Sequence, residues 1–124
     1  MEETYIRGVP LENGLFLKLY DASRRFAGDR WLVKLIARIP IPVDEVWQQT
    51  SEELPSAAAV KELLGDTLVF EQEKTRNFID EQEKEEILQS MTEEFFRHAL
   101  AYLGRPEFGW RCIRRKFREN HFSS

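Results

Sequence analysis

The residues with the clearest chemical potential form a basic cluster close to the C-terminal end of the sequence. Between positions 105 and 121, six basic side chains stand against two acidic ones, a net charge of +4 in a chain whose formal net charge is −4. Guanidinium groups bind phosphates and carboxylates in bidentate pairs, and neighbouring aromatic rings can stack on bases. The candidate ligand-binding residues are Trp110, Arg111, Arg114, Arg115, Lys116 and Arg118.

Three interpretations of this cluster are open. The arginines can face the acidic helix expected from Asp80 to Leu103 while Trp110, Ile113 and Phe117 fasten the segment to the core. They can contact a partner protein or the second subunit of a homodimer. They can also bind nucleic acid, a nucleotide or another phosphorylated ligand, with Arg24 and Arg25 as additional contacts. Because the strongest field near the cluster is that of the acidic remainder of the chain, the sequence favours the first interpretation.

A second pattern concerns nucleotides. Asp21-Ala22-Ser23 followed by Gly28 is similar to the D-x-S-x-x-G half of the signature of PilZ domains, and Arg111 and Arg115 have the spacing of its R-x-x-x-R half. The resemblance implies a cyclic-di-GMP ligand. The glycine lies two residues farther along than the pattern requires, however, and the arginine pair follows that segment instead of preceding it. The chain is therefore not assigned to this family.

Metal and catalytic chemistry have little support. Glu94 and His98 are spaced to share one helix face, but no second histidine or cysteine pair completes a metal site. Cys112 lies beside arginines, which favour a thiolate, yet it has no resolving cysteine or clear histidine base; we interpret it as a small buried side chain. We expect no metal and no cofactor. The absence of catalytic motifs argues against the common enzyme classes, though not against an unfamiliar enzymatic activity.

Length and composition indicate one globular domain over residues 1–124, with residues 105–124 as a basic terminal segment. The chain is 42% hydrophobic and 32% charged, and its nine Phe and three Trp argue against disorder. A single cysteine suggests a reducing compartment, and the acidic N-terminus lacks the features of a signal peptide. The most apolar stretch, 31–43, is too short to span a bilayer. We expect a cytoplasmic protein.

The first half of the sequence predicts an antiparallel meander. Asn13-Gly14 is typical of a two-residue type I′ turn between strands over 5–12 and 15–26. A turn at Gly28-Asp29 leads to a third strand over 31–41. An irregularity is expected at positions 22–25 of the second strand. The prolines at positions 40 and 42 should end the third strand.

The second half predicts helices around one further strand. A short helix begins with a capping box at Thr50 and Glu53 or with Pro55, and ends at Gly65. A fourth strand covers 67–76. Asp80 and Glu83 begin a long helix that ends near Leu103. Its first half is acidic, and its apolar stripe is expected to pack on the apolar face of the sheet. The last segment, 108–117, fits a helix better than a strand. The fold class is α+β.

Taken together, these patterns favour a non-catalytic binding or protein-interaction module. The alternative is binding of an anion, a nucleotide or nucleic acid through the arginine cluster.

Overall fold

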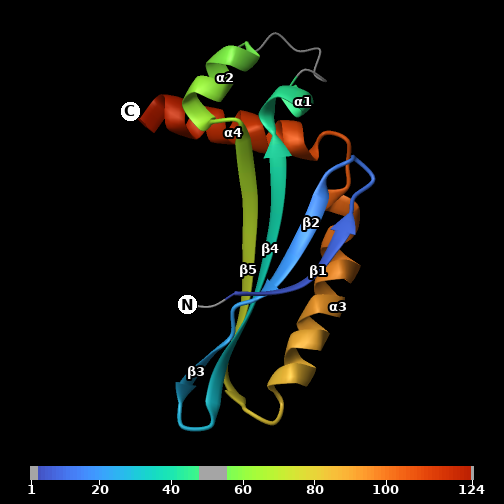
Figure 1. Ribbon diagram of the computed structural model, residues 1–124, viewed down its shortest axis with the longest axis vertical. Helices are drawn as coiled ribbons and strands as arrows, with labels where there is room; N and C mark the ends of the chain where they lie inside the picture. The colour runs from blue at the N-terminus through green and yellow to red at the C-terminus, as the bar shows by residue number, and fades with distance from the viewer. Residues whose placement is uncertain (1–2, 48–55, 124) are drawn as a thin grey trace.

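The computed structural model describes residues 3–47 and 56–123, with side chains up to position 120. In this part of the chain, a five-stranded antiparallel sheet combines with one long helix along a face and shorter helices at one end (Figure 1). The predicted α+β class is therefore confirmed. The elements are β1 (Thr4–Pro10), β2 (Phe16–Asp21), β3 (Arg24–Ala27), β4 (Arg30–Pro42), α1 (Val43–Trp47), α2 (Ala57–Leu64), β5 (Thr67–Asp80), α3 (Lys84–Leu103) and α4 (Phe108–Ser123).

The sheet is organised around β4, which pairs with β5 along one edge and with β2 and β3 along the other. The predicted irregularity in the second strand is confirmed, because the chain leaves regular pairing between Asp21 and Arg24. Asp21 Oδ1 accepts a hydrogen bond from Ser23 N at 2.9 Å, and Ser23 Oγ accepts one from Lys34 N at 3.0 Å. The break is thus held by side chains that satisfy its backbone donors.

The predicted type I′ turn at Asn13-Gly14 is wrong in its detail. The loop has three residues: Leu11 N donates to Leu15 O at 2.8 Å, and Gly14 N donates to Leu11 O at 3.0 Å. Only Gly14 has a positive φ, of 89°. Asn13 stays in the ordinary region of φ, where its Oδ1 accepts from Leu15 N at 3.0 Å. The result is a turn followed by a left-handed glycine, the usual three-residue hairpin.

The prediction that the third strand ends at the prolines is confirmed, because β4 ends at Pro42 and α1 follows directly. Pro40 lies inside the strand, and the two prolines pair with Val69 and Thr67 of β5. Pairing of β4 with β2, in contrast, begins only at Arg38. A proline without an N–H is tolerated where a strand has no neighbour on one side. The two prolines therefore occupy the part of β4 whose second edge is open.

The long helix α3 begins at Lys84 and not directly after Asp80, because Asp80 closes a separate turn. Its carboxylate accepts from Gln82 N at 2.9 Å and its carbonyl oxygen accepts from Glu83 N at 2.8 Å. The predicted apolar stripe packs on the sheet, where Met91 and Phe95 are buried beside Val33, Leu35, Ala37 and Ile39 of β4. None of the helices within the described ranges is long and apolar enough to cross a bilayer.

Helices α1, α2 and α4 contact one another at one end of the sheet (Figure 1). Ser56 begins α2 by accepting a hydrogen bond from Ala59 N at 3.2 Å, and Gly65 ends it with a φ of 91°, as predicted. The predicted caps at Thr50, Glu53 and Pro55 lie outside the described residues. α4 confirms the helical interpretation of the last segment.

The opposite end is formed by β3 and the adjoining ends of β4 and β5. Gly28 there has a φ of 59°, which confirms the predicted turn. β5 extends farther than predicted and contains a bulge, because Asn77 and Phe78 lie between the pairs that Arg76 and Ile79 make with β4. Phe78 has a φ of 57°, a strained conformation for an aromatic residue, and 66% of its surface is exposed.

Candidate functional site

The candidate arginines lie on α4, which is fixed to the rest of the molecule by its apolar side. Ile113 is fully buried, and Trp110 and Phe117 pack against the core. The ring of Trp110 stacks on that of Trp47 in α1, with centroids 6.3 Å apart and an interplanar angle of 20°. The predicted attachment of the segment through Trp110, Ile113 and Phe117 is therefore confirmed.

Four of the candidate residues share one side of α4, defined here as the arginine face: Arg111, Arg114, Arg115 and Arg118. Residues three, four and seven positions apart lie above one another on a helix, so this spacing makes a continuous stripe. With Trp110 and Glu119 they line a shallow hollow of about 430 Å³. The guanidinium carbon of Arg114 lies 4.8 Å from the centroid of the Trp110 ring. Trp110 thus supports the stripe from one side.

Three residues of the arginine face form no ion pair with any described residue. Arg111, Arg115 and Arg118 are exposed, and no carboxylate in the described part of the chain lies within ion-pair distance of them. At the same end of the molecule, the carboxylates of Asp44 and Asp66 form ion pairs with Lys61, whose Nζ lies 2.8 and 3.3 Å from their oxygens. The neighbouring guanidinium groups therefore repel one another.

Lys116 stands apart from the arginine face. Its Nζ lies 3.8 Å from a carboxylate oxygen of Glu119, one turn along the same helix. Exposed pairs of this kind contribute little to stability. The structure therefore brings together five of the six candidate residues, with Trp110 as the supporting ring, and turns Lys116 to another side.

Pairing of the arginines with the acidic helix, the interpretation that the sequence favoured, is not what the structure shows. The acidic first half of α3 begins at the end of the molecule opposite α4 (Figure 1). Acidic residues near it are paired locally: Glu81 with Arg25 at 3.2 Å, and Glu94 with Arg76 at 3.7 Å. Charge composition indicated an attraction, but the sheet holds the two charged regions apart.

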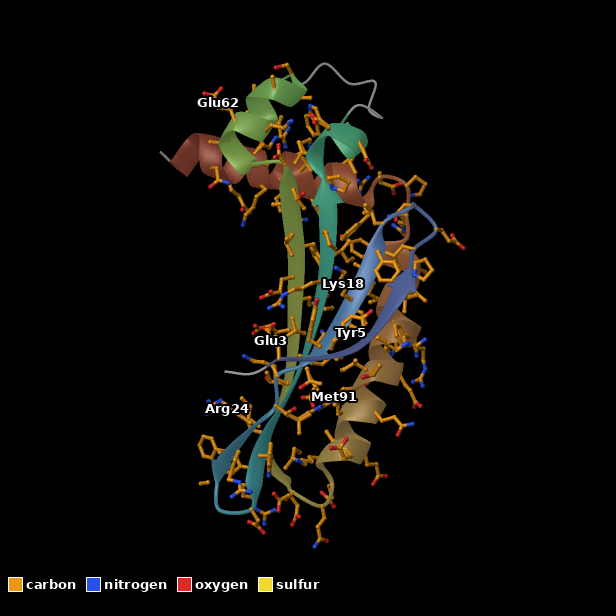
Figure 2. The ribbon with its side chains drawn as sticks, viewed as in Figure 1. Glu3, Tyr5, Lys18, Arg24, Glu62 and Met91 are labelled. Atoms are coloured by element: carbon orange, nitrogen blue, oxygen red, sulfur yellow. The ribbon has the colours of Figure 1, made fainter. Side chains whose placement is uncertain are left out.

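The additional contacts expected from Arg24 and Arg25 are also separated from α4. Figure 2 shows Arg24 on β3, at the far end of the sheet. Arg25 pairs with Glu81 and lies 5.8 Å from the Trp31 ring. The two halves of the nucleotide-like pattern, around Ser23 and on α4, accordingly do not form one site.

The helical pair Glu94 and His98 lies on α3 beside β5. Glu94 pairs with Arg76, and no group of three potential metal ligands occurs among the residues that the structure describes. Both side chains instead line a cleft between α3 and β5, together with Met91 and Phe95.

Cys112 is partly buried on α4 and has no disulfide partner. Burial raises the pKa of its thiol above the ordinary value, and the positive charge of Arg115 lowers that pKa by a smaller amount. The thiol form is therefore favoured at neutral pH. This agrees with the interpretation of Cys112 as a small packing residue.

Two functional features were not predicted from the sequence. Helix α1, which carries Trp47, was missed, although Val43, Val46 and Trp47 show the helical spacing of a short apolar face and are all buried. The cleft beside β5 was missed because it depends on where α3 crosses the sheet. The sequence of α3 or of β5 alone does not indicate where the helix crosses the sheet.

The chain has no counterpart in the comparisons with known proteins: no family profile, no curated protein and no solved structure matches it significantly. Function is therefore argued from the surface of the molecule itself.

Proposed function

We propose that the chain is a non-catalytic binding module that holds an acidic segment of a partner protein on the arginine face of α4. The observation that carries the proposal is the set of exposed guanidinium groups at positions 111, 115 and 118, for which the described residues supply no acidic partner. Like charges at these spacings cost a helix about 0.2–0.5 kcal/mol per pair. A bound anion removes that repulsion.

The overall charge favours a short acidic segment over a long nucleic acid. The chain carries −4 in total, so a polyanion that extends beyond α4 meets repulsion from the rest of the surface. Among the described residues that line the hollow, Trp110 is the one aromatic residue; its ring already stacks on Trp47, and this reduces its availability for a base. Nucleic acid is the second candidate, because guanidinium groups also pair well with phosphates.

The test is a titration with a fluorescein-labelled peptide of twelve residues rich in aspartate and glutamate, followed by anisotropy. Arg111→Gln combined with Arg115→Gln should weaken binding about tenfold, as expected when two charge pairs of up to about 1 kcal/mol each are lost. The matched control is Arg24→Gln with Arg97→Gln, which removes the same charge from exposed positions elsewhere and should leave binding within about twofold.

A second titration uses a single-stranded oligonucleotide of twelve residues. If the oligonucleotide binds more tightly than the peptide, with the same dependence on Arg111 and Arg115, the ligand of the arginine face is nucleic acid and not a protein segment. Equal losses in the variant and in the control would show only a general effect of charge, and the proposed site would be wrong.

A further inference from the structure

Among the described residues, nothing pairs with the outer edge of β5. Within the described residues β5 pairs only with β4, and from Glu73 to Phe78 its side chains are exposed on both faces. Figure 1 shows β5 at the margin of the sheet, with α3 on the side of β1 and β2. Alternate N–H and C=O groups of such an edge point to solvent and can pair with another extended chain.

A cleft of about 460 Å³ lies between β5 and α3, next to this edge. Its floor is apolar, because Met91 and Phe95 are almost fully buried there beside Ala99. Figure 2 shows Met91 between α3 and the sheet. The polar groups that line the cleft are Gln72, Lys74, Thr75 and Arg76 from β5 and Glu94 and His98 from α3. A chain added to β5 would direct every second side chain to this side of the sheet.

The charges of β5 argue against a second copy of the chain as the occupant. The cleft side of the strand carries Lys74 and Arg76, whereas Glu71 and Glu73 pair with Arg38 and Lys34 on the other side. Two antiparallel copies place the same faces together, so basic residues would meet basic ones and acidic residues acidic ones. Like charges opposite one another destabilise a strand pair.

The same charges define a better occupant. Arg76 is paired with Glu94 at 3.7 Å, but no carboxylate of the described residues pairs with Lys74. The cleft thus offers a positive rim above an apolar floor. An apolar side chain over Met91 and Phe95 would be complemented by carboxylates two positions before and after it on the incoming strand.

We propose that β5 binds an extended peptide segment by strand addition, with an apolar residue in the cleft and acidic residues at alternate positions beside it. Backbone hydrogen bonds along the edge provide affinity, and the cleft provides selectivity. The site is separate from the arginine face of α4, so either proposal can fail without the other.

The probe is a panel of blocked, fluorescein-labelled peptides of the pattern Thr-Asp-Thr-X-Thr-Asp-Thr, with Leu, Val, Met or Phe at X. Binding is measured by anisotropy, and hydrogen exchange locates the contact. At least one peptide should bind and slow exchange along β5. Lys74→Glu should weaken that binding about fivefold, as expected for one reversed surface charge. Ala99→Trp, which fills the cleft, should weaken it about tenfold or more.

The matched control is Glu73→Lys, which reverses a charge on the opposite face of the same strand and should change the affinity less than twofold. Lys74 is exposed, so its variant remains informative if Ala99→Trp fails to fold. Four results would overturn the proposal: no binding by the whole panel, equal loss with Glu73→Lys and Lys74→Glu, slowed exchange on β1 in place of β5, or concentration-dependent protection of β5 without peptide, which would make a second copy the occupant.

Discussion

The side chain of Asn13, in the first hairpin, donates from Nδ2 to the carbonyl oxygen of Leu103 at 2.9 Å, across 90 residues of sequence. The same nitrogen also donates to Arg105 O at 2.9 Å. The carbonyl groups at the end of a helix need external donors. Asn13 therefore joins the β1–β2 turn to the end of α3 and to the connection that leads into α4.

This relationship predicts that Asn13→Asp is destabilising although the two side chains have the same shape. The carboxylate can still accept from Leu15 N, but it loses the donor and places a negative charge beside two carbonyl oxygens. The free energy of unfolding should fall by about 2 kcal/mol, as expected when buried or partly buried groups lose their partners. Urea denaturation measures the difference. A change below about 0.5 kcal/mol would show that the two contacts do not contribute.

The Asn13 contacts also show where prediction from sequence ends. Local chemistry located the hairpin correctly, because Asn and Gly favour turns in any context. The loop type was wrong because Asn13 uses its side chain to cap a helix far away in the sequence, and such a partner cannot be identified from neighbouring residues. Pro40 and Pro42 illustrate the same limit, since their tolerance in β4 depends on where β2 stops pairing.

For the candidate site, helical spacing correctly placed Trp110, Ile113 and Phe117 on the side of α4 that packs against the core. The choice of a partner for the arginines from net charge was wrong. Net charge indicates only that the arginines of α4 and the acidic residues of α3 attract each other. The position of α3 on the sheet decides whether these side chains come within ion-pair distance. Long periodic helices were therefore predicted well, and contacts between elements were not.

The core contribution of α3 gives a second prediction. Phe95 has only 5% of its surface exposed, so Phe95→Ala should lower the free energy of unfolding by about 3–5 kcal/mol through lost burial and a cavity. The matched control is Phe26→Ala, because Phe26 is 54% exposed and its ring contacts that of Phe78 with centroids 5.2 Å apart. That variant should cost about 1 kcal/mol. Equal costs in thermal or urea denaturation would contradict the assignment of the core to the α3 side.

Cys112 gives a prediction about pH. Because burial raises the pKa of its thiol, the protonated form is favoured more strongly in the folded than in the unfolded chain. Its contribution to stability is fully present below the ordinary thiol pKa and is lost as pH rises through the folded pKa. Cys112→Ala should therefore remove part of the loss of stability seen on going from pH 8 to pH 10.

Alkylation with iodoacetamide provides an independent readout for the same residue. The folded protein should react more slowly at pH 8 than the urea-unfolded chain, because less thiolate is present and access is limited. Reaction as fast as in the unfolded chain, or an identical pH dependence of stability in Cys112→Ala, would contradict the buried, protonated state.

Arg111, Arg115 and Arg118 of the arginine face are not held by acidic side chains within the described part of the chain, and this is the central claim. Its most direct test is the melting temperature of the wild type and of Arg111→Gln with Arg115→Gln, each at 20 mM and at 500 mM NaCl. At low salt the variant should melt at the same temperature or a few degrees higher, because the like-charge contacts 111–114, 111–115 and 115–118 are relieved. Salt should remove the difference by screening. A variant that melts several degrees lower at low salt, and recovers at high salt, would show that the arginines stabilise the fold and would contradict the account.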